Sequence, residues 1–456
     1  MKNFQPITPE IIEKLKAITG PTYVKTDRDL LLQYQTDYET NPAMFHVPDA
    51  AVLPANAEEI AAIVKLANEH DFPITVRSGG TSLADGAIPV CGGLVLCMDR
   101  LNKIIELNEE GMYMTVEAGV RTIDLQNEAK KVGSCMPATR RVLKAASSAA
   151  TWQPMPAAFA PSVTASPATR STAWKSSPRR ATSSNAAASS KRVRQATTWN
   201  SSSSAAKEPW HHHQGDGKAH SPAAVSFRCP GRLHRSAQGP SHGAETDEAG
   251  IDPTSVEYMD NSYVRGCADY CHCKDMPHYE DGIYVIITVE TFQEDELDTK
   301  MDTVCTICEE SGAVNVLEAD NRVWNMRRNC QTSVELQSKV FLTDDVVVPV
   351  HKIAGTIEKI MDIGQNYPFE VKINAHIGDG NLHIVLCKMD MSDEEWERNV
   401  EEFHQQVYAY AYSVGGRLAG EHGIGAKKLK YMEQFTPKGE LTIMKTIKRA
   451  LDPKGS

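Results

Sequence analysis

The sequence predicts an α+β protein of more than one domain, and three observations support this fold class. Residues 54–133 alternate between segments with helical spacing of apolar residues and short apolar segments typical of strands. After residue 250 the same mixture resumes. The length of 456 residues allows two or three domains, at about 100–200 residues per domain. We therefore expect a mixed α+β architecture built in more than one part.

The first half of the chain is predicted to place a glycine turn after its first clear strand. Residues 57–70, AEEIAAIVKLANEH, have helical periodicity and follow Asn56, a suitable N-cap. A strand at residues 73–77 leads into the turn SGGTSL, and further strands are expected around GGLVLCM and MYMTVEAG, with LNKIIELN between them. Backbone N–H groups in such a turn can form an anion-binding nest, although an ordinary tight turn is the simpler interpretation.

The second half is predicted to combine strands with longer helices. IYVIITVET, at residues 283–291, has the β-branched composition of a strand. Helices are expected at residues 295–313, DELDTKMDTVCTICEESGA, and at residues 394–416, EEWERNVEEFHQQVYAYAYSVGG.

The charge of the chain excludes one broad class of function but is unevenly distributed. With 48 Lys and Arg against 59 Asp and Glu, the net charge of −11 argues against a general nucleic-acid or membrane-surface binder. Residues 135–244, however, contain 15 basic and two acidic residues, and no Ile or Tyr. A segment so poor in branched apolar residues cannot bury much core.

The N-terminus and the cysteines indicate a cytoplasmic protein. MKNFQPITPEIIEKL has no apolar signal-peptide region, and no apolar run reaches the length of about 18 residues needed for a transmembrane segment. Eleven scattered cysteines fit reduced thiols. One group of residues could bind a metal or an iron–sulfur cluster, although ordinary buried thiols are favoured. The group consists of Cys267, Cys271, Cys273, His272, Cys305 and Cys308.

The basic middle segment, about residues 135–245, is interpreted as a translation in shifted reading frames. A structureless insert of this length is improbable inside a compact domain. Read two bases late, residues 148–159 permit Gly-Gly-Asn-Leu-Ala-Thr-Asn-Ala-Gly-Gly-Ile, and residues 204–210 permit Gly-Ser-Glu-Gly-Thr-Leu. Single-base losses near residues 134, 210 and 245 would sum to one codon and restore the frame. The alternative is a genuine basic linker.

Four motifs in order resemble one enzyme family. PITVRSGGTSLADGAIPVCGGLVLCMDRLNKI, followed by TVEAGV, is similar to the flavin-loop half of the FAD-linked oxidases and dehydrogenases that share the vanillyl-alcohol-oxidase fold. INAHIGDGNLHIVL and GEHGIGAKK resemble the D-2-hydroxyacid branch, which contains the glycolate oxidase catalytic subunit and D-lactate dehydrogenases. The two reconstructed glycine-rich runs match flavin contacts of the same family. In frame, the resemblance covers about residues 20–133 and 250–456.

The resemblance implies a domain arrangement. A helical lead-in at residues 1–45 would precede a two-subdomain, PCMH-type FAD-binding domain at residues 46–245. Residues 246–456 would form an α+β substrate-capping domain built on an antiparallel sheet.

FAD is the implied cofactor, with its pyrophosphate on the glycine loop. A Rossmann dinucleotide site is disfavoured because no GxGxxG stands between strand and helix. The expected cofactor-binding residues are Arg77, Ser78, Gly79, Gly80, Thr81 and Ser82.

Two histidines around a glycine turn and a distant Glu-His pair form the second candidate site. His376 and His383 flank GDGN, and Glu421 precedes His422. Their imidazoles and carboxylate suit a divalent metal such as Zn²⁺ or Mn²⁺, although hydrogen-bonded turn residues are an alternative. The resemblance implies metal ligation by His376, His383 and Glu421, and a general-base role for His422.

The resemblance also implies a substrate-binding arginine. Arg327 in VWNMRRN matches the family's carboxylate-binding position, while Arg328 and a surface salt bridge are alternatives. Related dehydrogenases often carry a Lys near the position of Thr343, so the substrate pocket departs from the family pattern there.

The expected activity is oxidation of D-lactate or glycolate by hydride transfer to flavin N5. The alternatives are a D-2-hydroxyglutarate-type dehydrogenase and a non-catalytic product of a frame-shifted gene. A quinone, an electron-transferring flavoprotein and an iron–sulfur partner subunit are all open as electron acceptors.

A protein made from the printed sequence is expected to bind little or no FAD, because it lacks both glycine-rich flavin contacts. Flavin absorbance of the purified protein measures this directly. A yellow sample with near-stoichiometric flavin would contradict the expectation, and resequencing the coding DNA across residues 130–250 tests the frame shift itself.

Overall fold

The structure is a computed structural model that describes most of the chain outside the basic middle segment. Its described residues are 4–109, 113–132, 134–135, 173–176, 184–186, 203–209, 211–212, 220–228, 253, 255–290, 294–319 and 321–452. The expected frame-shifted segment therefore lies outside the described residues, apart from these short strands.

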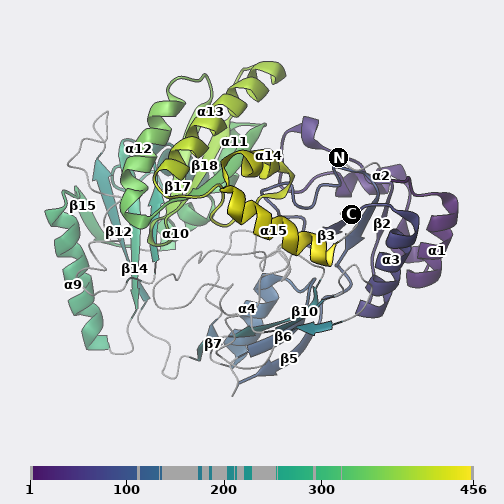
Figure 1. The fold of residues 1–456 in the computed structure, drawn as a ribbon. Coiled ribbons are helices and arrows are strands. Elements are labelled where there is room, and N and C mark those ends of the chain that lie inside the picture. Colours follow the sequence, from purple (N-terminus) through teal and green to yellow (C-terminus); the bar gives the residue numbers. More distant parts are fainter. Residues whose placement is uncertain are drawn as a thin grey trace.

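A small sheet with helices against it forms the N-terminal part (Figure 1). Its strands, in spatial order, are β1 (Val24–Lys25), β2 (Ala50–Val52), β4 (Leu94–Cys97) and β3 (Ile74–Arg77). The strands β2, β4 and β3 are parallel, and the helices α1 (Pro9–Thr19) and α3 (Ala57–His70) share a buried core with them. A short helix, α2 (Arg28–Leu31), follows β1. As predicted, the Asn56 side chain caps α3 by accepting a hydrogen bond of 2.8 Å from the Glu59 N–H.

A second, antiparallel sheet follows in the chain. Its order is β5 (Ile104–Asn108), β6 (Tyr113–Glu117), β10 (Ser203–Pro209), β8 (Ala173–Ser176) and β9 (Ser184–Ala186). The helix α4 (Thr122–Lys131) contributes Leu125 and Ala129 to a small core with Met114 and Val116 of β6. The LNKIIELN segment therefore contains a strand. A separate two-stranded pair joins β7 (Ser134–Cys135) to β11 (His211–His212).

The C-terminal half is built on a larger antiparallel sheet, as the family resemblance implied for the capping domain. Its order is β15 (Asn315–Glu318), β12 (His220–Arg228), β14 (Gly282–Glu290), β13 (Ser255–Met259), β17 (Glu370–His376), β18 (Asn381–Cys387) and β16 (Phe341–Val347). All its neighbouring strands are antiparallel.

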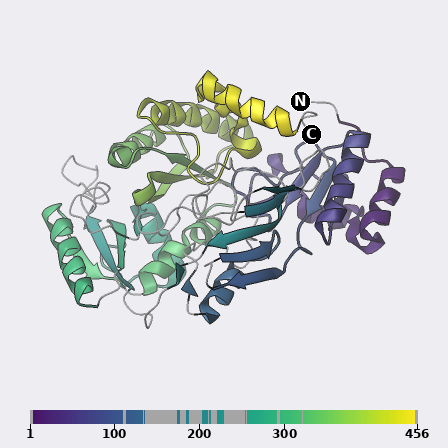
Figure 2. The ribbon, with the colours of Figure 1, turned by 60° about the horizontal axis from the view of Figure 1, so that its bottom comes forward.

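Helices cover both faces of this cap sheet (Figures 1 and 2). One face packs against α9 (Glu294–Glu310), α12 (Ile353–Gly364) and α13 (Asp393–Ser413). The other packs against α8 (Asn261–Cys271), α10 (Asn321–Arg328) and α11 (Cys330–Gln337). Because side chains alternate along a strand, Val285 and Ile287 of β14 enter the first core, whereas Tyr284 and Ile286 enter the second.

Two C-terminal helices connect the cap to the N-terminal part. Figure 1 shows α14 (Gly425–Phe435) and α15 (Lys438–Leu451) extending from the cap sheet toward the N-terminal strands. Hydrogen bonds cross this boundary, including one of 2.7 Å from the Thr40 hydroxyl to the Phe341 carbonyl. None of the helices in the described part of the chain combines the length and apolar character that crossing a bilayer requires.

Candidate active site

The glycine loop begins where β3 ends at Arg77, and its shape depends on a glycine at position 80. Gly80 has a φ of +63°. A Cβ added to it would lie 2.2 Å from a guanidinium nitrogen of Arg77. That guanidinium folds under the loop and donates a hydrogen bond of 2.6 Å to the Thr36 carbonyl. A side chain at position 80 would have to displace this guanidinium, and the positive φ disfavours any residue with a Cβ there.

Two serine hydroxyls fix the ends of the same loop. The Ser78 hydroxyl donates to the Ala118 carbonyl at 3.0 Å. The Ser82 hydroxyl accepts hydrogen bonds from the Ala84 and Gly86 N–H groups at 3.2 and 3.1 Å. The loop is therefore joined at one end to the second sheet and at the other to residues 84–86.

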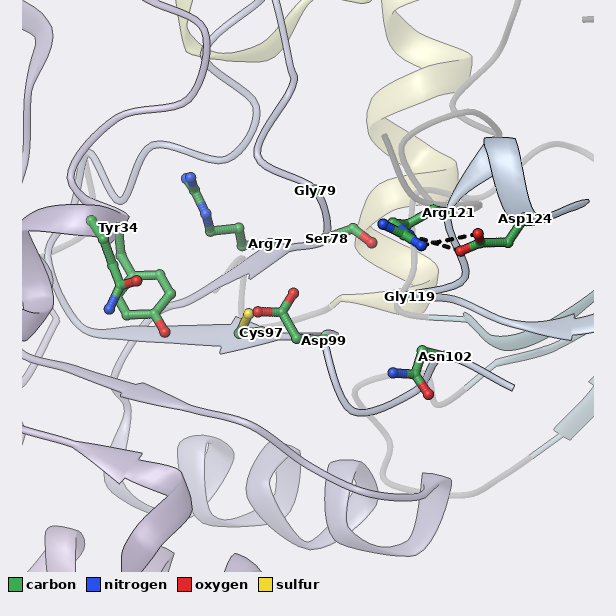
Figure 3. Close-up of a pocket in the computed structure, with 11 residues that line it drawn as sticks. Tyr34, Arg77, Ser78, Gly79, Cys97, Asp99, Asn102, Gly119, Arg121 and Asp124 are labelled. Carbon is green, nitrogen blue, oxygen red and sulfur yellow. Dashed lines mark hydrogen bonds and ion pairs between the residues drawn. The ribbon is translucent and has the colours of Figure 1, made fainter. Parts of the chain in front are cut away.

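A cavity of about 610 Å³ opens beside the loop (Figure 3). This volume is in the range of small-molecule and cofactor sites. Of the six residues predicted to bind the cofactor, Arg77, Ser78 and Gly79 line it, whereas Gly80, Thr81 and Ser82 are not among its lining residues. The lining residues that the sequence did not identify are Gln33, Tyr34, Cys97, Asp99, Asn102, Gly119, Arg121 and Asp124.

Gly119 is the one additional lining residue with a visible sequence signal, since it follows a strand in TVEAGV. A Cβ at this position would lie 2.2 Å from the Met98 carbonyl oxygen. Burial raises the pKa of both Tyr34 and Cys97 to about 12, so both are neutral at pH 7. The lining also carries the charged side chains of Arg77, Asp99, Arg121 and Asp124. A glycine loop with close backbone packing and two arginines fits a large anionic cofactor such as FAD.

The second predicted site lies at a β-hairpin of the cap sheet. His376 ends β17, a 3₁₀ turn spans Ile377–Asp379, and β18 begins at Asn381. Gly380 turns the chain with a φ of +76°, and a Cβ there would lie 2.0 Å from the Val348 carbonyl oxygen. The hairpin places the ring centroids of His376 and His383 4.9 Å apart.

Glu421 completes the group from a distant part of the chain. Its Oε1 lies 2.6 Å from His383 Nε2 and 3.5 Å from His376 Nε2. One potential ligand atom from each of the three residues lies within 4.8 Å of the other two. Two imidazole nitrogens and one carboxylate oxygen at this spacing are a suitable donor set for Zn²⁺ or Mn²⁺. The predicted ligands are therefore brought together.

Two buried oxygens at the same hairpin lack donors. Asp379 Oδ2 and Asn381 Oδ1 accept no hydrogen bond from any described residue. Burial raises the pKa of Asp379 to about 7. Because unpaired buried acceptors are costly, these oxygens also fit a site that receives a cation or a polar ligand.

Glu257, which the sequence analysis missed, supports His376 from the neighbouring strand. Its position in β13 is directly opposite His376. The two carboxylate oxygens lie 2.9 and 2.8 Å from His376 Nδ1, which leaves Nε2 facing Glu421. Burial alone would lower the pKa of His376, but the Glu257 charge and hydrogen bond raise it to about 10. A carboxylate behind a ligand histidine fixes the ring and raises its basicity. A lone Glu inside the apolar strand SVEYM was the available sequence signal.

Arg327 belongs to the same buried cluster. Its Nε and Nη2 donate to Glu257 Oε2 at 3.0 and 2.7 Å. Arg327 is buried, whereas the adjacent Arg328 is exposed. The structure therefore places Arg327, rather than its neighbour, beside the histidines, and its contact with the substrate stays a prediction.

The Glu421 and His422 backbone is shaped by Asp345, another residue that the sequence did not identify. Asp345 lies opposite His383 in the pairing of β16 with β18. Its Oδ2 accepts three successive backbone hydrogen bonds, at 2.7, 2.6 and 3.0 Å, from Gly420, Glu421 and His422. This carboxylate therefore determines the path of the loop that carries both functional side chains.

His422 is close to the predicted metal ligands and is neutral. Its ring centroid lies 4.8 Å from that of His383, and its Nδ1 lies 3.5 Å from Asp345 Oδ1. Burial lowers the pKa of His422 to about 4, against the opposing charge of Asp345. A neutral imidazole has the lone pair that a general base needs.

Lys428 balances the charge of Asp345. Its Nζ donates to Asp345 Oδ1 at 2.6 Å and to the Leu418 carbonyl at 2.8 Å. Burial would raise the pKa of Asp345, but the Lys428 charge and the backbone donors hold it well below its usual range. Asp345 is therefore a carboxylate at every physiological pH.

Comparison with known protein families places the two sites in context. Residues 48–179 match the FAD binding domain family, and residues 241–456 match the C-terminal domain of FAD linked oxidases. The first match contains the glycine loop, and the second contains the whole histidine cluster.

Curated relatives align over almost the entire chain. A D-lactate dehydrogenase of Anaerostipes hadrus is 26% identical over 99% of this chain and 96% of its own length. The glycolate oxidase subunit GlcD of Bacillus subtilis is 25% identical over 98% of this chain and 95% of its own. A D-2-hydroxyglutarate dehydrogenase of Stutzerimonas stutzeri is 26% identical over 98% and 97%, respectively.

The fold is also similar to that of a solved enzyme structure. The crystal structure of p-cresol methylhydroxylase with substrate bound matches with a TM-score of 0.77 and 13% identity, covering 97% of this chain and 94% of that one. The expected α+β architecture with a PCMH-type FAD-binding domain is thereby confirmed.

Removing the Asp345 carboxylate is expected to destabilise the protein. Asp345→Ala would leave the three N–H groups of residues 420–422 without their acceptor and would remove one of the two carboxylates beside Lys428, at a cost of about 3–5 kcal/mol. Urea denaturation measures the change. The matched control is Asp269→Ala, whose exposed ion pair with Lys274 should contribute less than about 1 kcal/mol. Equal losses in the two variants would contradict the role of Asp345.

Proposed function

Because the chain belongs to the FAD-linked oxidases and dehydrogenases, we propose that it oxidises a small D-2-hydroxy acid to the 2-oxo acid. D-lactate and glycolate are the proposed substrates. The observation that carries the proposal is the group of His376, His383 and Glu421, buried except for a partly exposed His383, beside the neutral imidazole of His422. Such a combination suits the binding of an oxygen-rich substrate and the removal of a hydroxyl proton.

Each residue of the cluster has a proposed task. His376, His383 and Glu421 would hold a divalent cation, which would supply polarisation of the substrate oxygens. FAD, when bound, would supply the acceptor for the hydride equivalent. His422 takes the hydroxyl proton on Nε2. His422 Nε2 lies 3.8 Å from Glu421 Oε1 and so faces the ligand group, while Nδ1 lies 3.5 Å from the Asp345 carboxylate on the other side of the ring.

Arg327 is the proposed partner of the substrate carboxylate. Its two hydrogen bonds to Glu257 hold the guanidinium in one orientation, so little side-chain entropy is lost when the substrate binds. Glu257 therefore supports both His376 and Arg327, and a single buried carboxylate positions two binding groups.

Two alternatives remain open beside the leading proposal. A dehydrogenase of D-2-hydroxyglutarate would need a cationic group for the second carboxylate of that substrate. At the position where related dehydrogenases often have a Lys, Thr343 is buried and accepts a hydrogen bond of 3.0 Å from Gln331. This neutral contact favours a monocarboxylate. The other alternative is the non-catalytic product of a frame-shifted gene.

The electron acceptor is proposed to be a partner protein. An electron-transferring flavoprotein and an iron–sulfur subunit both fit, because the relative GlcD is named as a subunit of glycolate oxidase.

The frame-restored protein is expected to reduce its flavin with D-lactate or glycolate in the absence of oxygen. The panel also contains L-lactate and D-2-hydroxyglutarate, and loss of flavin absorbance is followed by stopped-flow spectroscopy. His422→Asn should lower the reduction rate about 10²–10⁴-fold, because no base would accept the hydroxyl proton. His351→Asn, at an exposed histidine, is the matched control. A flavin that no hydroxy acid reduces would contradict the proposed function.

Metal binding is tested separately with the purified full chain after treatment with a chelator. Mutation of a residue that supports a metal ligand typically weakens metal binding about 10–100-fold. Because Glu421 is itself a proposed ligand, Glu421→Gln is expected to weaken Mn²⁺ or Zn²⁺ binding by at least that factor. Isothermal titration calorimetry measures the affinity, and Glu433→Gln on the exposed side of α14 is the control. A wild-type protein that binds neither ion would exclude the metal from the mechanism.

A further inference from the structure

Two adjacent lysines in the first turn of α14 bind opposite halves of the molecule. Lys428 holds Asp345 and the Leu418 carbonyl, both in the cap. Lys427 Nζ instead donates to the Leu83 carbonyl at 2.9 Å and lies 3.1 Å from Glu39 Oε2. Successive helical residues point about 100° apart, so neighbouring side chains can reach different surfaces.

The Lys427 ammonium is buried among carboxylates of the N-terminal half. Its side chain is 10% exposed, and Asp85 Oδ1 lies 3.5 Å away. Burial would lower the pKa of Lys427, but the charges of Glu39, Asp85 and Asp37 raise it. Lys427 therefore stays charged, and its removal would leave buried carboxylates without their cation.

Backbone packing brings the same two segments into direct contact. Gly425, which follows the Glu421 and His422 loop, has a φ of +50°. A Cβ at this position would lie 1.7 Å from the Ala84 carbonyl oxygen. The catalytic loop and the segment after the glycine loop therefore touch at a distance that admits no side chain.

The segment that Lys427 contacts is itself attached to the glycine loop. Leu83 and Asp85 lie within the turn closed by Ser82, whose hydroxyl accepts hydrogen bonds from Ala84 and Gly86. Glu39 is held on its other oxygen by the N–H groups of Thr40 and Asn41, each at 2.8 Å. A continuous set of contacts thus runs from the glycine loop to Lys427 and on to residues 420–425.

We propose that Lys427 is a positioning residue that sets the distance between the glycine loop, residues 77–82, and the loop that carries Glu421 and His422. This inference rests on the proposed function, in which the first loop holds the flavin and the second acts on the substrate hydroxyl. Hydride transfer depends steeply on the separation of donor and acceptor. Lys427 with its partners Glu39, Asp85 and the Leu83 carbonyl, here called the clamp, therefore affects the reaction without touching either reactant.

Hydrogen exchange tests the clamp without flavin, metal or substrate. In the full chain, Lys427→Met is expected to raise amide exchange rates about tenfold or more in residues 78–87 and in residues 420–426 together, because each segment loses its hold on the other. Protection in α12 should stay unchanged, which separates loop release from global unfolding. Lys430→Met is the matched control, since Lys430 lies on the same helix and pairs with Glu401 at the surface.

Two further variants test the proposal independently of Lys427→Met. Lys427→Arg retains the positive charge and should restore most of the protection, a rescue that loss of packing alone does not predict. Asp85→Asn removes a charged partner of Lys427 and serves as the test if Lys427→Met does not fold. It should raise amide exchange in the same two segments. Increased exchange confined to residues 420–426, in either variant, would overturn the proposal.

Kinetics of the frame-restored holoenzyme distinguish the clamp from the proposed function. Lys427→Met should lower the flavin reduction rate constant at least about tenfold while KM changes little, because Arg327 and the histidine cluster are intact. If wild type reduces its flavin and Lys427→Met does so at an unchanged rate, the positioning role is wrong. If wild type is inactive, the proposed function fails, and the exchange experiment still decides whether the clamp exists.

Discussion

The carboxylate of Asp345, with Lys428 as its counter-ion, is the interaction on which the candidate active site depends. It accepts three successive backbone N–H groups of the loop at residues 420–422 and is itself fixed on β16, opposite His383. A buried carboxylate is costly unless a cation and donors surround it. Here they come from a segment about 80 residues further along the chain, so satisfying this charge also assembles the site.

Charge pairing gives neighbouring histidines different properties within one cluster. Glu257 raises the pKa of His376 to about 10, whereas burial lowers that of His422 to about 4. His376 therefore has a strongly basic nitrogen that can bind a cation in place of its proton. His422 is a neutral imidazole that can accept a proton. Divergent environments of this kind commonly separate binding from acid–base roles in enzymes.

Prediction from sequence succeeded where the signal was local and was incomplete where partners were distant. Asn56 and the helical period of residues 57–70 predicted α3 because caps and periodicity act within a few residues. The four residues of the histidine cluster were found from short motifs and a family resemblance. Glu257 and Asp345 were missed because their importance comes from strand register, which pairs them with His376 and His383 across the sheet.

The sequence by itself determined the α+β class, the glycine loop, the histidines around GDGN and the anomalous composition of residues 135–244, because each depends on residues adjacent in the chain. Only the tertiary structure decided which charges meet. Lys427 and Lys428 are neighbours of the same type, yet one contacts Glu39 and the other Asp345. Their different partners follow from the direction of each side chain on α14 and from how two separately packed halves come together, which no local pattern encodes.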